Sequence, residues 1–262
     1  MLLATQLGSG PPLRAEPQHL PLILGLCGGQ ATVDRYDDLL TEADGVFYWG
    51  GKLSLVRPLP KAKTLVSFMS IEQIRQAREK LREARVDFVS FNPEQWRASK
   101  TPPEDYADLP AAVGRARKLT DELKTRLAFC PDNVLLEKDG ERVAPLVDLF
   151  TVQLQRFQVD PAPDFRSAAA RLIAMVRKGA AHVPVYAQLS MAPARWETRQ
   201  RPDGTVQRIH LRAPGGRKAL APLTAAEVLA QVAQLRDLVD GLVFLCPEDN
   251  GTELRKVVLA LR

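Results

Sequence analysis

Short runs of hydrophobic residues alternate along this chain with longer stretches of helical periodicity. Eight runs rich in β-branched and aromatic residues predict strands at 20–27, 44–50, 63–69, 86–92, 126–131, 147–155, 183–190 and 240–246. The stretches between them predict helices at 31–43, 70–84, 104–124, 162–179, 224–238 and 251–261, with a weaker and shorter one at 132–145. Strands that are almost continuously hydrophobic and alternate with helices are typical of a parallel sheet covered by helices.

The number of strands favours a closed barrel. Eight parallel strands form a (β/α)8, or TIM-type, barrel, and the 262 residues of the chain match the roughly 250 residues typical of that fold. A doubly wound open sheet is the alternative interpretation. Residues 50–62, "GGKLSLVRPLPKA", are too rich in Gly and Pro for a helix, so we expect the outer helix after the second strand to be missing.

One connection is longer than a barrel needs. Residues 191–222 separate the seventh strand from its helix, and "WETRQRPDGTVQRIHLR" within them alternates polar and apolar residues around an Asp-Gly turn. This pattern predicts a β-hairpin, and such an excursion often forms a lid or part of a site. We therefore predict a flexible N-terminal arm at 1–19 and one barrel domain at 20–262 that contains this insertion.

Composition narrows the function only slightly. The formal net charge of +5 permits an anionic ligand without requiring one. No apolar run approaches the ~20 residues of a membrane span, and the N-terminus lacks the pattern of a secretion signal, so a cytoplasmic protein is expected. Cys27, Cys130 and Cys246 are too scattered for a disulfide framework or a metal site. We interpret them as buried packing residues.

The active sites of barrel enzymes lie at the C-terminal ends of the strands. In this chain those ends supply Gly28–Gln30, Tyr48, Trp49, Ser67, Asn92, Glu94, Cys130, Asp132, Gln153, Gln155, Gln188, Ser190, Cys246, Glu248 and Asp249. The ring holds no histidine, which argues against a Ser-His-Asp triad and against a multi-His metal centre. GxGxxG and P-loop motifs are absent as well. We therefore expect neither a metal nor a cofactor.

Carboxylate chemistry remains. Glu94 lies in "FNPEQW" after the fourth strand, where many barrel glycosidases carry their acid in an Asn-Glu pair; here the order is Asn-Pro-Glu. Hydrolysis of a glycosidic bond needs a second carboxylate, for which Asp132 and Glu248 are the candidates, with Glu197 of the hairpin as a further one. The other interpretation of Glu94 is a polar residue that caps a loop.

Several other residues are candidates for ligand contacts. Gln153 and Gln155 share one face of the sixth strand by two-residue alternation, and because a buried amide needs a partner, they bind either a polar ligand or each other. The remaining candidates are Asn92, Gln188, Ser190, the stacking aromatics Trp49 and Trp96, and the basic residues Arg199 and Arg217. Segment 195–218 holds seven basic and two acidic residues, which favours either an anion site or a solvated hairpin.

The order of the motifs "FNPEQW" with "TPPED", "FTVQLQ", "YAQLSM" and "DGLVFL" resembles a group of uncharacterised bacterial TIM-barrel proteins, distantly reminiscent of glycoside-hydrolase-like barrels. The resemblance covers roughly residues 86–246. The matching residues are Glu94, Trp96, Gln153, Gln155 and Ser190. Asn92 and Thr151 stand where that pattern has Asp, which weakens any mechanism that needs an Asp there. The resemblance implies a barrel with polar residues gathered at one mouth, and it implies no particular activity.

The sequence therefore favours a glycosidase-like hydrolase with acid–base chemistry at the barrel mouth and a saccharide or other small molecule as its ligand. The alternative is a barrel without catalysis that binds an anionic ligand or partner through the basic hairpin. A membrane partner is not expected, and nucleic acid is disfavoured. Lyase or isomerase chemistry on a phosphorylated small molecule is compatible with "PGGRK", but no base can be assigned to it.

Overall fold

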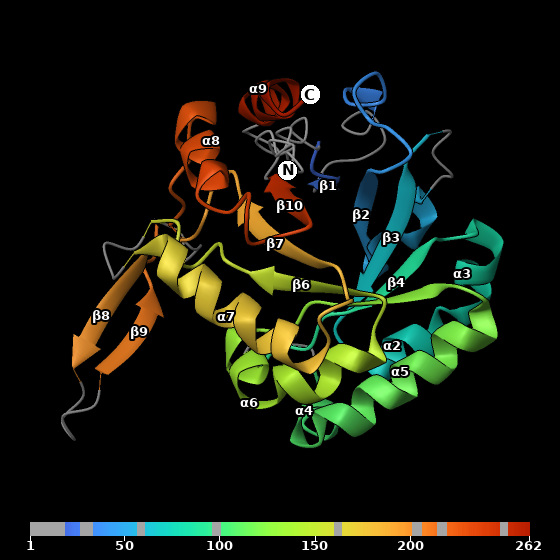
Figure 1. The fold of residues 1–262 in the computed structure, drawn as a ribbon. Helices are drawn as coiled ribbons and strands as arrows, with labels where there is room; N and C mark the ends of the chain where they lie inside the picture. The colour runs from blue at the N-terminus through green and yellow to red at the C-terminus, as the bar shows by residue number, and fades with distance from the viewer. Residues whose placement is uncertain are drawn as a thin grey trace, which may run out of the picture.

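The computed structural model of the protein describes residues 19–26, 34–56, 61–95, 101–159, 164–200, 206–213, 219–246 and 251–262. Eight parallel strands close into a barrel in the order β1-β10-β7-β6-β5-β4-β3-β2. They are β1 (Leu22–Leu26), β2 (Gly45–Trp49), β3 (Lys63–Phe68), β4 (Phe88–Phe91), β5 (Arg126–Phe129), β6 (Leu149–Gln153), β7 (Val185–Ser190) and β10 (Gly241–Cys246). The predicted barrel and all eight of its strands are confirmed, and the open sheet is wrong (Figure 1).

Helices cover the outside of the barrel (Figure 1). They are α2 (Ile71–Gln76), α3 (Arg78–Ala84), α4 (Glu104–Ala107), α5 (Leu109–Leu123), α6 (Asn133–Val143), α7 (Phe165–Gly179), α8 (Ala225–Ala233) and α9 (Gly251–Ala260), with short 3-10 helices η1 (Gly50–Leu55) and η2 (Ala144–Leu146). A capping box starts α8, because Thr224 and Glu227 cap each other's backbone.

The predicted helices differ from the observed ones in three places. Residues 35–43 form turns and irregular backbone instead of the expected helix. The stretch 70–84 is broken at Ala77, and the stretch 104–124 is broken at Asp108. At the second break the Asp108 side chain accepts the N–H of Ala111, so it starts a new helix within a segment of unbroken helical periodicity.

The predicted hairpin is also present. It consists of β8 (Trp196–Gln200) and β9 (Val206–His210), paired antiparallel with Trp196 opposite His210. In Figure 1 the hairpin extends away from the strands of the barrel. Its function as a lid stays a prediction, and so does the arm, of which residues 1–18 lie outside the described ranges. No helix among the described residues is long and apolar enough to cross a membrane.

Hydrophobic side chains fill the barrel on both faces of its sheet, because strand side chains alternate between the two faces. The larger cluster lies between the strands and the helices. The smaller cluster fills the inside and consists of Ile23, Phe47, Leu65, Phe88, Ala128, Leu149 and Val243, with Trp49, Tyr186 and Leu245 packed against it. The barrel is therefore a packed core, and space for a ligand must come from its C-terminal mouth.

Four aspartates hold neighbouring strands together at the end of the barrel opposite the mouth. Each one immediately precedes a strand and accepts the backbone N–H of a residue at the start of the preceding barrel strand. The pairs are Asp44 with Leu22 at 2.8 Å, Asp87 with Thr64 at 2.8 Å, Asp148 with Leu127 at 2.7 Å, and Asp240 with Val185 at 2.7 Å. A charged acceptor strengthens a backbone hydrogen bond, so these four bonds, hereafter the aspartate ties, stabilise neighbouring strands.

The aspartate ties predict a loss of stability in acid. Burial would raise the pKa of Asp44 and Asp148, but hydrogen bonds from Arg262 and Thr41 to Asp44, and from Arg117 and the Leu127 N–H to Asp148, hold both pKa values below the ordinary range. A carboxyl group whose pKa is lower in the folded state stabilises the fold above its unfolded pKa of about 4, and this stabilisation is lost as the pH falls through the folded value. We expect the unfolding temperature to fall between pH 5 and pH 2, and to fall less in the Asp148→Asn variant. Equal slopes for the two proteins would contradict this assignment.

Candidate active site at the barrel mouth

The inward-facing side chains become polar toward the C-terminal ends of neighbouring strands. Ser67, Ser90, Cys130, Thr151 and Gln188, from β3 to β7 in barrel order, line one cavity together with the apolar Ile23, Phe47, Leu65 and Val243. The cavity has a volume of about 10 Å³, which is room for roughly one water molecule. A larger ligand must therefore bind above this layer, at the mouth.

A network of amides forms the next layer. Gln153 at the end of β6 donates from Nε2 to Asn92 Oδ1 and to the Cys130 carbonyl, both at 3.2 Å. Gln155 Nε2 donates in turn to Gln153 Oε1 at 3.0 Å. The structure thus brings together three predicted site residues, and Asn92 is only 3% exposed. The Oε1 atom of Gln155 is buried and accepts no hydrogen bond from the described residues.

Gln188 extends the polar layer toward β7. Its Oε1 accepts from the Cys130 thiol at 3.5 Å. Burial raises the pKa of that thiol, and the negative charge of Glu94 raises it further. Cys130 is therefore a neutral packing residue, as the sequence indicated, and the Glu94 carboxylate lies close enough to act on a side chain that faces the barrel interior.

Hydrogen bonds hold the backbone that carries Glu94. The Glu94 N–H donates to Thr101 Oγ1 at 3.0 Å, and the Gln95 N–H donates to Asp132 Oδ2. The Asp132 N–H donates back to the Pro93 carbonyl at 3.1 Å. Glu94 itself is half-buried. The loop after β4 is thereby fixed to the end of β5, and Glu94 sits on ordered backbone.

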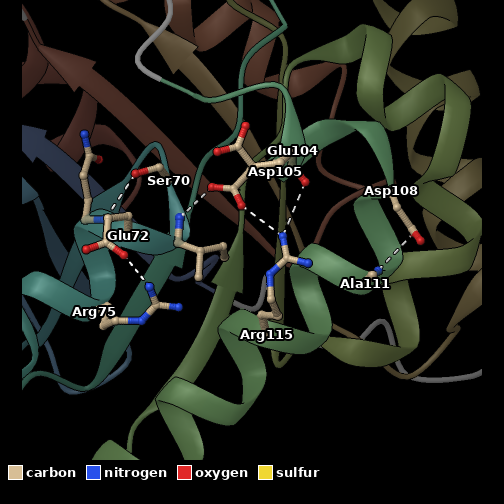
Figure 2. Close-up of polar contacts among 10 residues, drawn as sticks. Ser70, Glu72, Arg75, Glu104, Asp105, Asp108, Ala111 and Arg115 are labelled. Atoms are coloured by element: carbon tan, nitrogen blue, oxygen red, sulfur yellow. Dashed lines mark hydrogen bonds and ion pairs between the residues drawn. The ribbon is translucent and has the colours of Figure 1, made fainter.

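The same loop is tied to the helices beside it (Figure 2). Asp105, which is buried, accepts the N–H of Ile71 at the start of α2 at 2.8 Å, and it accepts from Arg115 of α5 at 3.0 Å. Figure 2 shows Ser70 at the start of the same helix, and Ser70 caps it by accepting the Gln73 N–H. These contacts join α4, which follows the segment that carries Glu94, to α2 and α5.

Asp132, a candidate for the second carboxylate, uses both of its carboxylate oxygens to accept backbone N–H groups. Its Oδ1 accepts the N–H of Leu135 at 2.9 Å, which makes Asp132 the N-cap of α6, and its Oδ2 accepts the N–H of Gln95. Both carboxylate oxygens therefore hold backbone in place. The sequence "PDNV" carries the signal for this cap.

Ser190 takes part in a second network through its main chain. The Ser190 N–H donates to Gln158 Oε1 at 2.7 Å, and its carbonyl accepts from Gln158 Nε2 at 3.1 Å. Gln158 also donates to Gln231 Oε1 of α8 at 2.8 Å. The Ser190 hydroxyl accepts the N–H of Ala192 at 3.2 Å. This network joins the ends of β6 and β7 to α8 and supports the mouth.

The remaining predicted site residues divide into two groups. Trp49 is partly buried and packs edge-on against Phe47, with ring centroids 4.9 Å apart, so its ring forms part of the interior. Trp96, Glu248 and Arg217 lie outside the described residues, as does the side chain of Arg199. Glu248 and the basic hairpin therefore stay predictions. No cluster of three or more His, Cys, Asp or Glu suited to a metal ion occurs in the described part of the chain.

Sequence reasoning missed Gln158, Asn133 and Arg156. Asn133, the first residue of α6, donates to the Gln153 carbonyl at 2.9 Å. Gln158 and Arg156 follow Gln155 in "QLQRFQ", and the signal that could have identified them is the continued run of polar residues past the end of the strand. Their burial depends on tertiary packing, which periodicity does not report.

Comparisons with known proteins establish the fold. No protein-family profile matches the chain, and no curated protein matches its sequence. Among solved structures, the spore cortex-lytic enzyme SleL of Bacillus megaterium QM B1551 superposes with a TM-score of 0.56 at 10% identity, over 96% of this chain and 75% of SleL. An HpcH/HpaI aldolase/citrate lyase family protein of Burkholderia cenocepacia J2315 gives 0.53 at 13% identity, over 95% of each chain.

A third similar structure is 3-hexulose-6-phosphate synthase, with a TM-score of 0.51 at 11% identity, over 92% of this chain and 99% of that chain. These three proteins carry out different chemistry on one architecture. The likeness therefore shows a TIM-type barrel, and the chemistry has to be argued from the site.

Proposed function

We propose that the mouth of the barrel binds a hydroxyl-rich small molecule of the saccharide class and that Glu94 is its acid–base group. The polar layer carries this proposal. Barrel interiors are ordinarily filled by branched aliphatic side chains, yet here the inner positions of five neighbouring strands hold hydroxyl, thiol and amide groups. Amides that both donate and accept suit the hydroxyl groups of a sugar.

Glu94 is suited to proton transfer by its position. It stands beside the amide network on backbone that Thr101 and Asp132 hold, and its charge acts on the interior Cys130. A carboxyl group in such a place can protonate a leaving oxygen or remove a proton from water. The specific reaction that we propose is the hydrolysis of a glycosidic bond, as in glycosidases.

Glycosidase-like hydrolysis also needs a partner carboxylate about 5–9.5 Å from Glu94. Both oxygens of Asp132 accept backbone N–H groups, and a carboxylate held in this way is poorly placed to attack a sugar. We therefore assign Asp132 a positioning role and retain Glu248, at the end of β10, as the second carboxylate.

Replacing Gln155 with Leu tests the binding site. We expect about fivefold weaker binding of the saccharide, because Gln155 Oε1, which accepts from none of the described residues, is a ready acceptor for a hydroxyl group, and one lost hydrogen bond amounts to roughly 1 kcal/mol. Thermal-shift screening of wild type with mono- and disaccharides identifies the ligand, and calorimetry then gives the two affinities.

Gln76→Leu on the exposed face of α2 is the matched control, and its affinity should equal that of wild type. Unchanged affinity in Gln155→Leu would remove Gln155 from the site. Stabilisation of wild type by no saccharide would contradict the proposed function.

A further inference from the structure

Arg156 is a cation at the edge of the mouth that forms no ion pair with a described residue. It follows Gln155 directly after β6 and is partly buried. Its Nε is buried and donates to none of the described residues. No ion pair is formed by Arg156 within the described part of the chain, whereas its neighbour Arg171 pairs with Glu137 at 2.8 Å. Its guanidinium lies 4.8 Å from the ring centroid of Phe157.

The charges around Arg156 do not compensate for its burial. Burial lowers the pKa of Arg156, the carboxylates of Glu137 and Asp132 oppose this effect, and Arg171 adds to it, with a net lowering. Glu137 is engaged by Arg171, and Asp132 is engaged by the N–H groups of Leu135 and Gln95. A desolvated cation without a close partner lowers the stability of the empty protein.

Two buried oxygen atoms on residues near Arg156, Asn133 Oδ1 and Gln155 Oε1, accept no hydrogen bond from the described residues. Asn133 is only 3% exposed, and its Oδ1 has no hydrogen-bond partner among the described residues, although its Nδ2 donates to the Gln153 carbonyl. Gln155 Oε1 is likewise buried and unpartnered. Buried polar atoms without partners are rare in proteins, and here a donor and two acceptors occur on connected residues beside one amide network.

We infer that Arg156 binds an oxyanion group of the ligand, and that the ligand is a polyhydroxy compound carrying a carboxylate or a phosphate. The guanidinium would donate to the oxyanion, and ligand hydroxyl groups would donate to Gln155 Oε1 and Asn133 Oδ1. This inference rests on the proposed function and narrows it from saccharides in general to acidic or phosphorylated ones. Arg suits such a group because its planar fork matches two oxygens of a carboxylate or a phosphate.

The test compares three ligands with one ring: glucose, glucuronate and glucose 6-phosphate. Affinities are measured by calorimetry for wild type, for Arg156→Met, and for Arg75→Met, an exposed arginine paired with Glu72 on α2. We expect wild type and Arg75→Met to bind at least one charged sugar about tenfold or more tightly than glucose, and Arg156→Met to lose that preference. Which charged sugar binds distinguishes a carboxylate from a phosphate.

The unfolding temperature without ligand provides an independent readout. Methionine keeps the apolar stem of Arg156 and removes the unpaired charge, so Arg156→Met should unfold at the same temperature as wild type or a higher one. A drop beyond that of Arg75→Met would mean that Arg156 is structural, and it would overturn the inference. Charged sugars that bind no better than glucose, or a preference that survives in Arg156→Met, would overturn it as well.

Failure of this inference is distinguishable from failure of the proposed function. If glucose and the charged sugars bind equally well and Gln155→Leu weakens their binding, the saccharide site is supported and the oxyanion site is contradicted. Inorganic phosphate or acetate that binds as tightly as the charged sugars, through Arg156 alone, leaves the oxyanion site and removes the saccharide site. Absence of binding by every probe contradicts both.

Discussion

Replacing Asp44 with alanine is expected to lower the free energy of unfolding by about 3–5 kcal/mol. The Asp44 side chain is 0% exposed and binds Arg262 at the end of the chain. It also accepts the N–H of Leu22 at 2.8 Å and both the N–H and the hydroxyl of Thr41 at 2.7 Å. Alanine leaves these donors without their acceptor and leaves the Arg262 charge unpaired.

Urea unfolding of wild type and variant measures this effect, with equal m-values as the sign that both unfold to a comparable state. Asp87→Ala is the matched control, because Asp87 makes the same bond to Thr64 and no ion pair is found for it among the described residues. We expect it to lower stability by about 1–3 kcal/mol. If Asp44→Ala proves no more destabilising than Asp87→Ala, the contact between Arg262 and Asp44 contributes nothing to stability.

Replacing Glu94 with glutamine is expected to lower kcat on the saccharide identified by screening by about 10²–10⁴-fold. Glutamine keeps the shape of the side chain and its ability to hydrogen-bond, but it cannot transfer a proton. KM should change little, because the amide network that we propose as the sugar-binding site remains. Glutamine also leaves the backbone hydrogen bonds of Glu94 and Gln95 in place, and the unfolding temperatures of wild type and variant are compared to check the fold.

Initial rates across pH separate a catalytic Glu94 from a binding one. The pH–rate profile of wild type should have a limb that is due to the Glu94 carboxyl group, and the profile of Glu94→Gln should lack that limb. Glu104→Gln, an exposed carboxylate on α4, is the control and should keep the full rate. A Glu94→Gln protein that turns over as fast as wild type would exclude acid–base catalysis by this residue.

The fold was predictable because its signal is local. Barrel strands buried on both faces read as nearly continuous apolar runs, and every such run in this chain became a strand. The stretch 31–43 had the composition of a helix, and residue 34 is helical, but residues 35–43 form turns and irregular backbone. Propensity over so short a stretch is a weak guide once tertiary contacts compete with it.

The candidate site was only partly predictable. Two-residue alternation placed Gln153 and Gln155 on one face, and the structure joins them by a hydrogen bond. Its place at the end of a strand selected Asp132, and the structure shows both of its carboxylate oxygens accepting backbone N–H groups; its catalytic role stays a prediction. Arg156 was not among the predicted site residues. The chain has 36 Lys and Arg residues, and the sequence does not show which of their side chains becomes buried.

The aspartate ties join the eight barrel strands in four consecutive pairs. Three of them join residues only 22, 23 and 21 positions apart, and the fourth spans 55 positions because the hairpin insertion lies within it. The entropy lost in closing such a loop grows only slowly with its length. The longer fourth loop adds only about 0.8 kcal/mol of closure entropy. The insertion can therefore be long at little entropic cost to the tie that encloses it.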